Sequence, residues 1–179
     1  MYSTSHRALD TSKWRCCGMH VEKGAFYIGL LGAALAATAA VIYFVSGSIL
    51  MGIAAIVNLL IYLSILYAQK QGNPSYYLPF LIVNGLALLG HVAYCIYILL
   101  IYINMPYWYL EPMRDDWRRQ GYFYNEYEFR NRLQNTLMFL GLFTLAYVLT
   151  AAFFYWVVWQ AYQYMKERNR QTPPNTYRA

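Results

Sequence analysis

Three long stretches of the chain contain no charged residue. No Asp, Glu, Lys or Arg occurs in 24–68, in 71–110 or in 133–165. A transmembrane helix needs about 20 mostly apolar residues. The first stretch is therefore long enough for two helices, with a tight turn at Ser46-Gly47 between them. This pattern predicts four membrane-spanning helices, at 24–45, 48–68, 78–103 and 136–159.

These segments predict an all-α fold, a four-helix transmembrane bundle, because backbone groups in hydrocarbon must pair within the helix. We expect an N-terminal tail at 1–23, a transmembrane domain at 24–164 and a C-terminal tail at 165–179. The first apolar segment lacks an A-x-A-like cleavage site, so we expect it to be retained as a span rather than removed as a signal peptide. The loop at 104–135 is then the one sizeable region outside the membrane.

The positive charges predict the orientation. The two tails and the loop between the second and third spans hold nine of the 14 Lys and Arg residues, and 104–135 holds the other five. The excess of Lys and Arg marks the cytosolic side, so we expect both termini in the cytosol. Basic flanks beside anionic lipid account for the net charge of +6, and no nucleic-acid partner is expected.

Composition argues against catalysis. The chain is 59% hydrophobic and 12% charged, with three histidines, whereas a soluble domain carries roughly 25% charged residues. We find no Ser-His-Asp set, H-E-x-x-H motif, P-loop or G-x-G-x-x-G motif. A catalytic site needs several titratable groups that converge. We therefore expect no enzyme activity and no cofactor.

The first span carries small residues at helical spacing. Such residues let helices approach closely in lipid, either within one chain or between subunits, and both readings stay open. The residues are Ala25, Gly29, Gly32, Ala33, Ala36, Ala37 and Ala40.

Three polar side chains fall inside the second and third spans. They are Asn58, Asn84 and His91. Folding the second span against the third brings Asn58 and His91 to similar depth, so we expect a hydrogen bond between them. The alternative is functional, because an ionisable group inside a membrane often marks a transport pathway or a proton relay.

The cysteine pair Cys16-Cys17 stands just before the first span, whereas Cys95 falls inside the third, where a thiol packs as a small apolar group. Cytosolic cysteines beside a membrane are common sites of S-palmitoylation, so the pair is a lipidation candidate; the alternative is that both remain unmodified. A disulfide is not expected in the reducing cytosol. No metal site is expected, because adjacent cysteines with His20 do not have zinc-ligand spacing.

The loop at 104–135 predicts two helical segments. Pro112 favours the start of a helix and Gly121 its end. Asn125 followed by Glu128 resembles a capping box, and Glu126 and Glu128 precede Arg130 and Arg132 at i,i+4 spacing. We expect the fourth helix to begin near Glu126, in water, and to run unbroken into the membrane. The aromatic residues of the loop give it a surface for the membrane or for a partner.

The segment RCCGMHVEKGAFYIGLLG, followed by four spans, resembles the lysosome-associated transmembrane (LAPTM) family and related small nematode-type tetraspan proteins. The likeness lies in Cys16, Cys17, His20, Val21 and Gly24. It implies an endosomal or lysosomal membrane protein that sorts or regulates other membrane proteins, with the plasma membrane as a second location. Tails of this family carry PPxY motifs for ubiquitin ligases with WW domains. Here the tail reads Pro173-Pro174-Asn175-Thr176-Tyr177, one residue longer.

The expected function is therefore a non-enzymatic adaptor or regulator of other membrane proteins. Its partners would be the lipid bilayer and membrane proteins that bind the first span and the 104–135 loop. Tyr162 and Met165 fit a Tyr-x-x-Φ sorting signal. The alternative is a small transporter or channel-type subunit that uses Asn58, Asn84 and His91.

Overall fold

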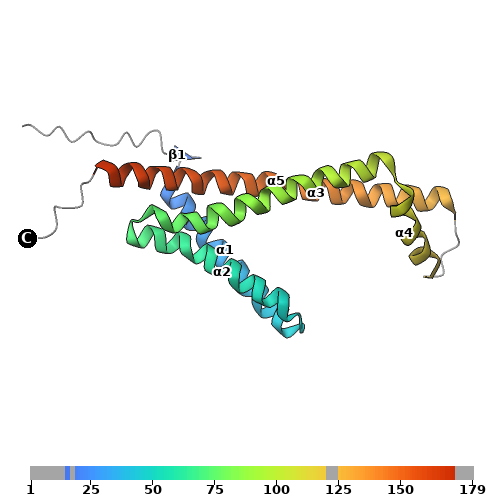
Figure 1. The fold of residues 1–179 in the computed structure, drawn as a ribbon, viewed down its shortest axis with the longest axis horizontal. Helices are drawn as coiled ribbons and strands as arrows, with labels where there is room; N and C mark the ends of the chain where they lie inside the picture. Colours follow the sequence, from blue (N-terminus) through green and yellow to red (C-terminus); the bar gives the residue numbers. More distant parts are fainter. Residues whose placement is uncertain (1–14, 17–18, 120–124, 172–179) are drawn as a thin grey trace, which may run out of the picture. The chain divides into compact units, whose positions relative to one another are not determined.

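The computed structural model describes residues 15–16, 19–119 and 125–171. Two short strands, β1 (Arg15–Cys16) and β2 (Met19–His20), pair antiparallel ahead of the helices. The helices are α1 (Val21–Val45), α2 (Ile49–Gln71), the 3-10 turn η2 (Pro74–Tyr77), α3 (Leu78–Asn104), α4 (Tyr107–Arg119) and α5 (Glu126–Gln171) (Figure 1). Four of them, α1, α2, α3 and α5, are long and apolar enough to cross a membrane. The prediction of an all-α fold with four long apolar helices is confirmed.

The fourth apolar helix is much longer than a membrane is thick. It begins at Glu126, as expected, and continues past the predicted boundary at 159. Its 46 residues give a length of about 69 Å, because an α-helix rises about 1.5 Å per residue. The hydrocarbon core of a bilayer is about 30 Å thick, so α5 extends beyond it.

The turn between α1 and α2 is as tight as expected. Gly47 has a φ of 78°, a left-handed conformation that glycine adopts without a steric penalty. The Ser46 N–H donates to Ile42 O at 2.9 Å and the Ser48 N–H to Tyr43 O at 2.9 Å. These bonds satisfy carbonyl groups at the end of α1. The two helices therefore fold back on each other and lie side by side (Figure 1).

The small residues of α1 form the face that packs on α2. All seven residues predicted for close packing are buried or half-buried. A Cβ atom added at Gly29 would lie 3.1 Å from the Leu66 side chain, and one added at Gly32 would overlap the Tyr62 ring. This face is therefore occupied within the chain, which leaves the larger side chains of α1 to face outward.

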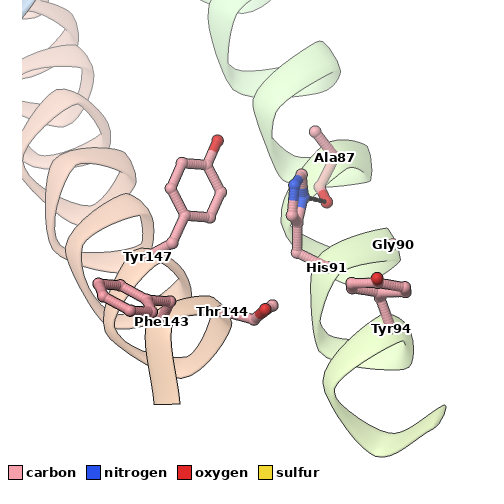
Figure 2. Close-up of a pocket in the computed structure, with 7 residues that line it drawn as sticks. All are labelled: Ala87, Gly90, His91, Tyr94, Phe143, Thr144 and Tyr147. Atoms are coloured by element: carbon pink, nitrogen blue, oxygen red, sulfur yellow. Dashed lines mark hydrogen bonds between the residues drawn. The ribbon is translucent and has the colours of Figure 1, made fainter. Parts of the chain in front are cut away.

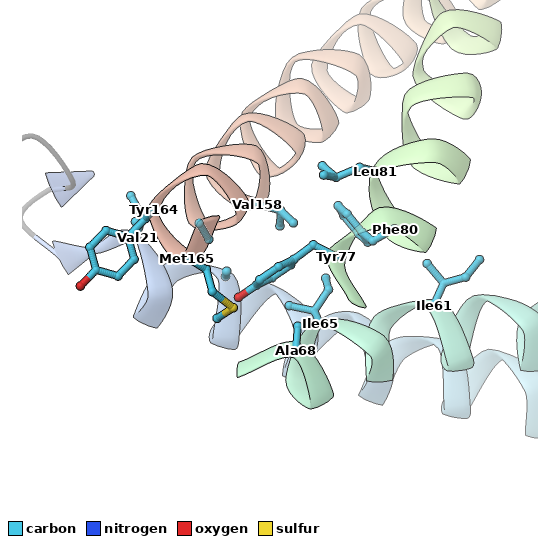
Figure 3. Close-up of a cluster of buried hydrophobic side chains, with 12 residues drawn as sticks. Val21, Ile61, Ile65, Ala68, Tyr77, Phe80, Leu81, Val158, Tyr164 and Met165 are labelled. Carbon is cyan, nitrogen blue, oxygen red and sulfur yellow. The ribbon is translucent and has the colours of Figure 1, made fainter. Parts of the chain in front are cut away.

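The described chain forms two compact units, one from the residues up to Gly85 and from Phe153 onward, and the other within Leu86–Ala152. The core of the first unit gathers around Tyr77, Ile65, Val158 and Met165, whose side chains are fully buried. Figure 3 shows the Tyr77 ring between α2 and α5, with its hydroxyl group directed toward Met165. That hydroxyl is buried with no hydrogen bond within the described residues, and Gln69 is its polar neighbour.

Local sequence places Tyr77 at the centre of this core. Gly72 ends α2 with a φ of 66°, and Asn73 Oδ1 accepts a hydrogen bond of 3.0 Å from the Ser75 N–H. Pro74 then starts η2, where its missing N–H costs nothing. The turn thus places Tyr77 between α2 and α5, directly before the start of α3 (Figure 3).

The second unit has a smaller core of Ile98 and Ile101 from α3 and Leu137 from α5. The predicted start of α4 at Pro112 is wrong, because α4 begins at Tyr107 and contains Pro112. The break lies earlier: Met105 has a φ of 40°, and the carbonyl of Pro106 accepts from the N–H groups that open the new helix. The predicted end at Gly121 lies outside the described residues.

Candidate functional site

Polar side chains of the first unit meet where α1 begins and α5 ends; we name Glu22, Gln69, Arg168 and Asn169 the end cluster. Arg168 Nη1 donates to Glu22 Oε1 at 2.9 Å. Gln69 Nε2 donates to the Glu22 carbonyl oxygen at 2.7 Å, and Asn169 Nδ2 donates to the Gly72 carbonyl oxygen at 2.8 Å. The end cluster therefore joins the start of α1, the end of α2 and the end of α5.

Helix polarity favours this arrangement. An acid in the first turn of α1 and a base in the last turn of α5 each complement the dipole of their own helix. The ring of His20 packs edge-on against Tyr164 with centroids 4.6 Å apart, and the Arg168 guanidinium lies 5.9 Å from the centre of the same ring. The segment ahead of α1 is thus held against α5.

The end cluster is suited to holding helices together. It contains one carboxylate and one guanidinium, about 26% and 36% exposed, and two amides. Lys23 and Lys70 lie exposed at the same helix ends. Ammonium groups at a membrane boundary attract anionic lipid headgroups.

A cavity of about 660 Å³ lies in the second unit (Figure 2). His91 and Tyr147 face each other across it from α3 and α5, with ring centroids 4.9 Å apart. A Cβ atom added at Gly90 would meet no atom within 4 Å, so this part of the cavity is open. The lining residues are Ala87, Gly90, His91, Tyr94, Phe143, Thr144 and Tyr147.

The hydrogen bond of His91 indicates which nitrogen of its ring carries the proton. Nδ1 lies 2.7 Å from the Ala87 carbonyl oxygen, and a carbonyl only accepts, so Nδ1 carries the proton. In a neutral ring, Nε2 is then an acceptor.

A second cavity, of about 370 Å³, contains Cys95 among apolar side chains of α3 and α5. Cys95 is half-buried there, as an apolar packing group.

Two of the three polar residues predicted inside the spans, Asn58 and Asn84, belong to the first unit. Asn84 belongs to the first unit and donates to the Phe80 carbonyl oxygen at 3.1 Å, whereas His91 belongs to the second. Asn58 is exposed on α2. The predicted hydrogen bond between Asn58 and His91 joins residues of the two different units and stays a prediction.

The structure describes only some of the candidate lipidation and sorting residues near the two ends of the chain. Cys16 lies in β1, whereas Cys17 and the 173–177 segment lie outside the described residues. Tyr162 is half-buried and Met165 is fully buried in the core of the first unit. An adaptor protein could therefore reach the Tyr162–Met165 signal only if the end of α5 were to leave the core.

Sequence reasoning missed the end cluster. Glu22 and Arg168 stand 146 positions apart, and each looks like an ordinary charge flanking a membrane span. The one available signal was their position, an acid at a helix start and a base at a helix end.

Among residues 19–119 and 125–171, no group of three or more His, Cys, Asp or Glu side chains is placed to hold a metal ion. The chain matches no known family model, no curated protein and no solved structure.

Proposed function

We propose that the chain is a non-enzymatic multi-pass membrane protein that regulates or sorts other membrane proteins in endosomal and lysosomal membranes. The observation that supports this role best is the Glu22–Arg168 ion pair of 2.9 Å. It holds the start of the first apolar helix beside the end of the last one. The two tails therefore leave the first unit from neighbouring points.

Neighbouring tails suit an adaptor. The N-terminal tail carries the lipidation candidates Cys16 and Cys17, and the C-terminal tail carries the 173–177 candidate for a WW domain. Acyl chains on the first tail would hold the recruiting segment of the second close to the membrane. The resemblance of the segment before α1 to the lysosome-associated family supports the same role and location.

The α4 region offers a surface for a partner on the other side of the membrane. Arg114 Nη2 lies 3.3 Å from Glu126 Oε1 and ties α4 to the start of α5. Tyr107 and Trp108 are 66% and 59% exposed, and Tyr127 is 80% exposed. Aromatic side chains of this kind are enriched at protein interfaces. Because α2 covers the small-residue face of α1, we place partner contacts on this surface rather than on that face.

Co-purification tests the adaptor role. Tagged protein is isolated in mild detergent from cells, and its location is compared with lysosomal markers. We expect specific membrane proteins to co-purify and a Trp108→Ala, Tyr127→Ala double variant to lose them. The matched control is Arg132→Ala, which changes an exposed residue of α5 while leaving the aromatic surface intact. Recovery of no membrane protein with the unchanged chain would contradict the role.

Acylation is tested separately. We expect hydroxylamine-sensitive acyl labelling of the unchanged chain and loss of that labelling in the Cys16→Ser, Cys17→Ser double variant. Labelling that persists in the double variant would exclude these two cysteines as the site.

The cavity beside His91 favours a second candidate, a small transporter or channel-type subunit. An open cavity with a histidine acceptor near the middle of α3 is the kind of feature that transport pathways use. Flux through the reconstituted protein that disappears in His91→Ala while the fold persists would favour this candidate. Loss of folding in the same variant would show that His91 is structural.

A further inference from the structure

Asn58 differs from the other Asn, His, Ser and Thr side chains that lie on the helices within the four predicted spans, at 24–45, 48–68, 78–103 and 136–159. Each of the others bonds to a carbonyl of its own helix. The bonded residues are Thr38, Ser64, Asn84, His91, Thr136, Thr144 and Thr150. The Asn58 side chain makes no hydrogen bond within the described part of the first unit and is exposed.

Such a side chain needs a partner at this depth. Asn58 stands near the middle of α2, which runs from Ile49 to Gln71. A carboxamide carries two donor hydrogens and one acceptor oxygen, and hydrocarbon offers a partner to none of them. Lipid around this part of α2 would therefore leave the Asn58 amide unsatisfied.

Within the first unit, the face of α2 that carries Asn58 is open over half of its length. Ile61 and Ile65 lie on this face and are buried in the core of the first unit. Toward the start of α2, Met51 is 55% exposed and Ala54 is also exposed. Ala54 stands one turn before Asn58, and a small residue there lets another helix approach closely.

We propose that this face is the contact between two copies of the chain, with Asn58 of one copy hydrogen-bonded to Asn58 of the other in place of the bond to His91 of its own chain that the sequence suggested. A carboxamide is complementary to itself, since its N–H groups match the oxygen of an identical group. Two copies inserted in the same direction and related by a twofold axis along the membrane normal bring the same residue together at the same depth. This contact goes beyond the proposed adaptor role and does not depend on it.

Dimerisation in lipid vesicles is the direct test. Donor- and acceptor-labelled copies of the full chain are reconstituted over a range of protein-to-lipid ratios, and energy transfer gives the dimer fraction. We expect Asn58→Leu to weaken dimerisation by about tenfold, as an interhelical amide bond in a membrane would. Asn58→Gln should retain most of it. The matched control is Asn84→Leu, because the Asn84 amide already bonds to Phe80 O. Equal dimer fractions for the unchanged chain and Asn58→Leu, or a monomeric unchanged chain at every ratio, would overturn the proposal.

Crosslinking tests the same contact between two copies if Asn58→Leu fails to fold. In a background with Cys16→Ser, Cys17→Ser and Cys95→Ala, we expect Ala54→Cys to form a disulfide between chains on mild oxidation. Leu60→Cys, which is also exposed but lies on another face of α2, should not. Equal crosslinking of the two variants, or none at Ala54→Cys, would exclude the contact.

Discussion

Single small residues set the distance between α1 and α2. The sequence predicted the face at Ala25, Gly29 and Ala33 because small residues recur along it at helical spacing. It could not predict the covering helix, since a smooth face serves a neighbour in the same chain or in another one equally well. The structure supplies Tyr62, whose ring lies where a side chain at Gly32 would be.

Two alanine substitutions compare this packed glycine with an open one. Gly32→Ala should destabilise the fold by about 1–3 kcal/mol, because the added methyl group overlaps the Tyr62 ring. Gly90→Ala should instead stabilise by about 0.5–1 kcal/mol, because the methyl group meets no atom and alanine favours helix. Unfolding in mixed micelles by titration with denaturing detergent measures both. Equal effects would contradict the close packing at Gly32.

The end cluster is a second feature at the residue scale. Glu22→Gln and Arg168→Gln, singly and combined, form a double-mutant cycle. We expect a coupling of about 1 kcal/mol, since both groups are partly screened by solvent. The control pair Glu128–Arg132, more exposed and on one helix, should couple by about 0.3–0.5 kcal/mol. A coupling between Glu22 and Arg168 no larger than the control would show that this ion pair does not hold the helix ends together.

At the scale of elements, local signals decided where helices begin. Asn125 predicted the start of α5, and its Oδ1 accepts from the Tyr127 N–H at 3.1 Å. The sequence predicted a helix start at Pro112. Met105 instead has a left-handed backbone conformation, and α4 begins at Tyr107, directly after Pro106. Nothing local distinguishes the two prolines, because either could occupy a first helical turn.

The cap at Asn125 gives a prediction for α5. Asn125→Ala removes the acceptor for the Tyr127 N–H and should cost the helix start about 1 kcal/mol. Hydrogen exchange of the first-turn amides should then quicken several-fold, while amides deeper in α5 stay unchanged. The control is Asn131→Ala, inside the same helix. Equal exchange in the two variants would show that the cap contributes nothing.

At the scale of the whole molecule, the sequence predicted four apolar helices because charge is absent over long stretches. It did not predict two compact units, each with its own core. Apolar side chains are equally satisfied by lipid or by protein, so their pattern does not say which of them meet. The central claim is that the four helices cross a membrane alternately and that both tails lie on one side.

Cysteine accessibility in sealed vesicles tests this claim most directly. Ser46→Cys, Ser75→Cys and Asp115→Cys are made singly in a background without other cysteines and labelled with a reagent that does not cross membranes. These sites lie in the α1–α2 turn, in η2 and in α4. We expect Ser75→Cys to react from the same side as a tag on either tail, and Ser46→Cys and Asp115→Cys only from the opposite side. Reaction of all three from one side would contradict the four-span account.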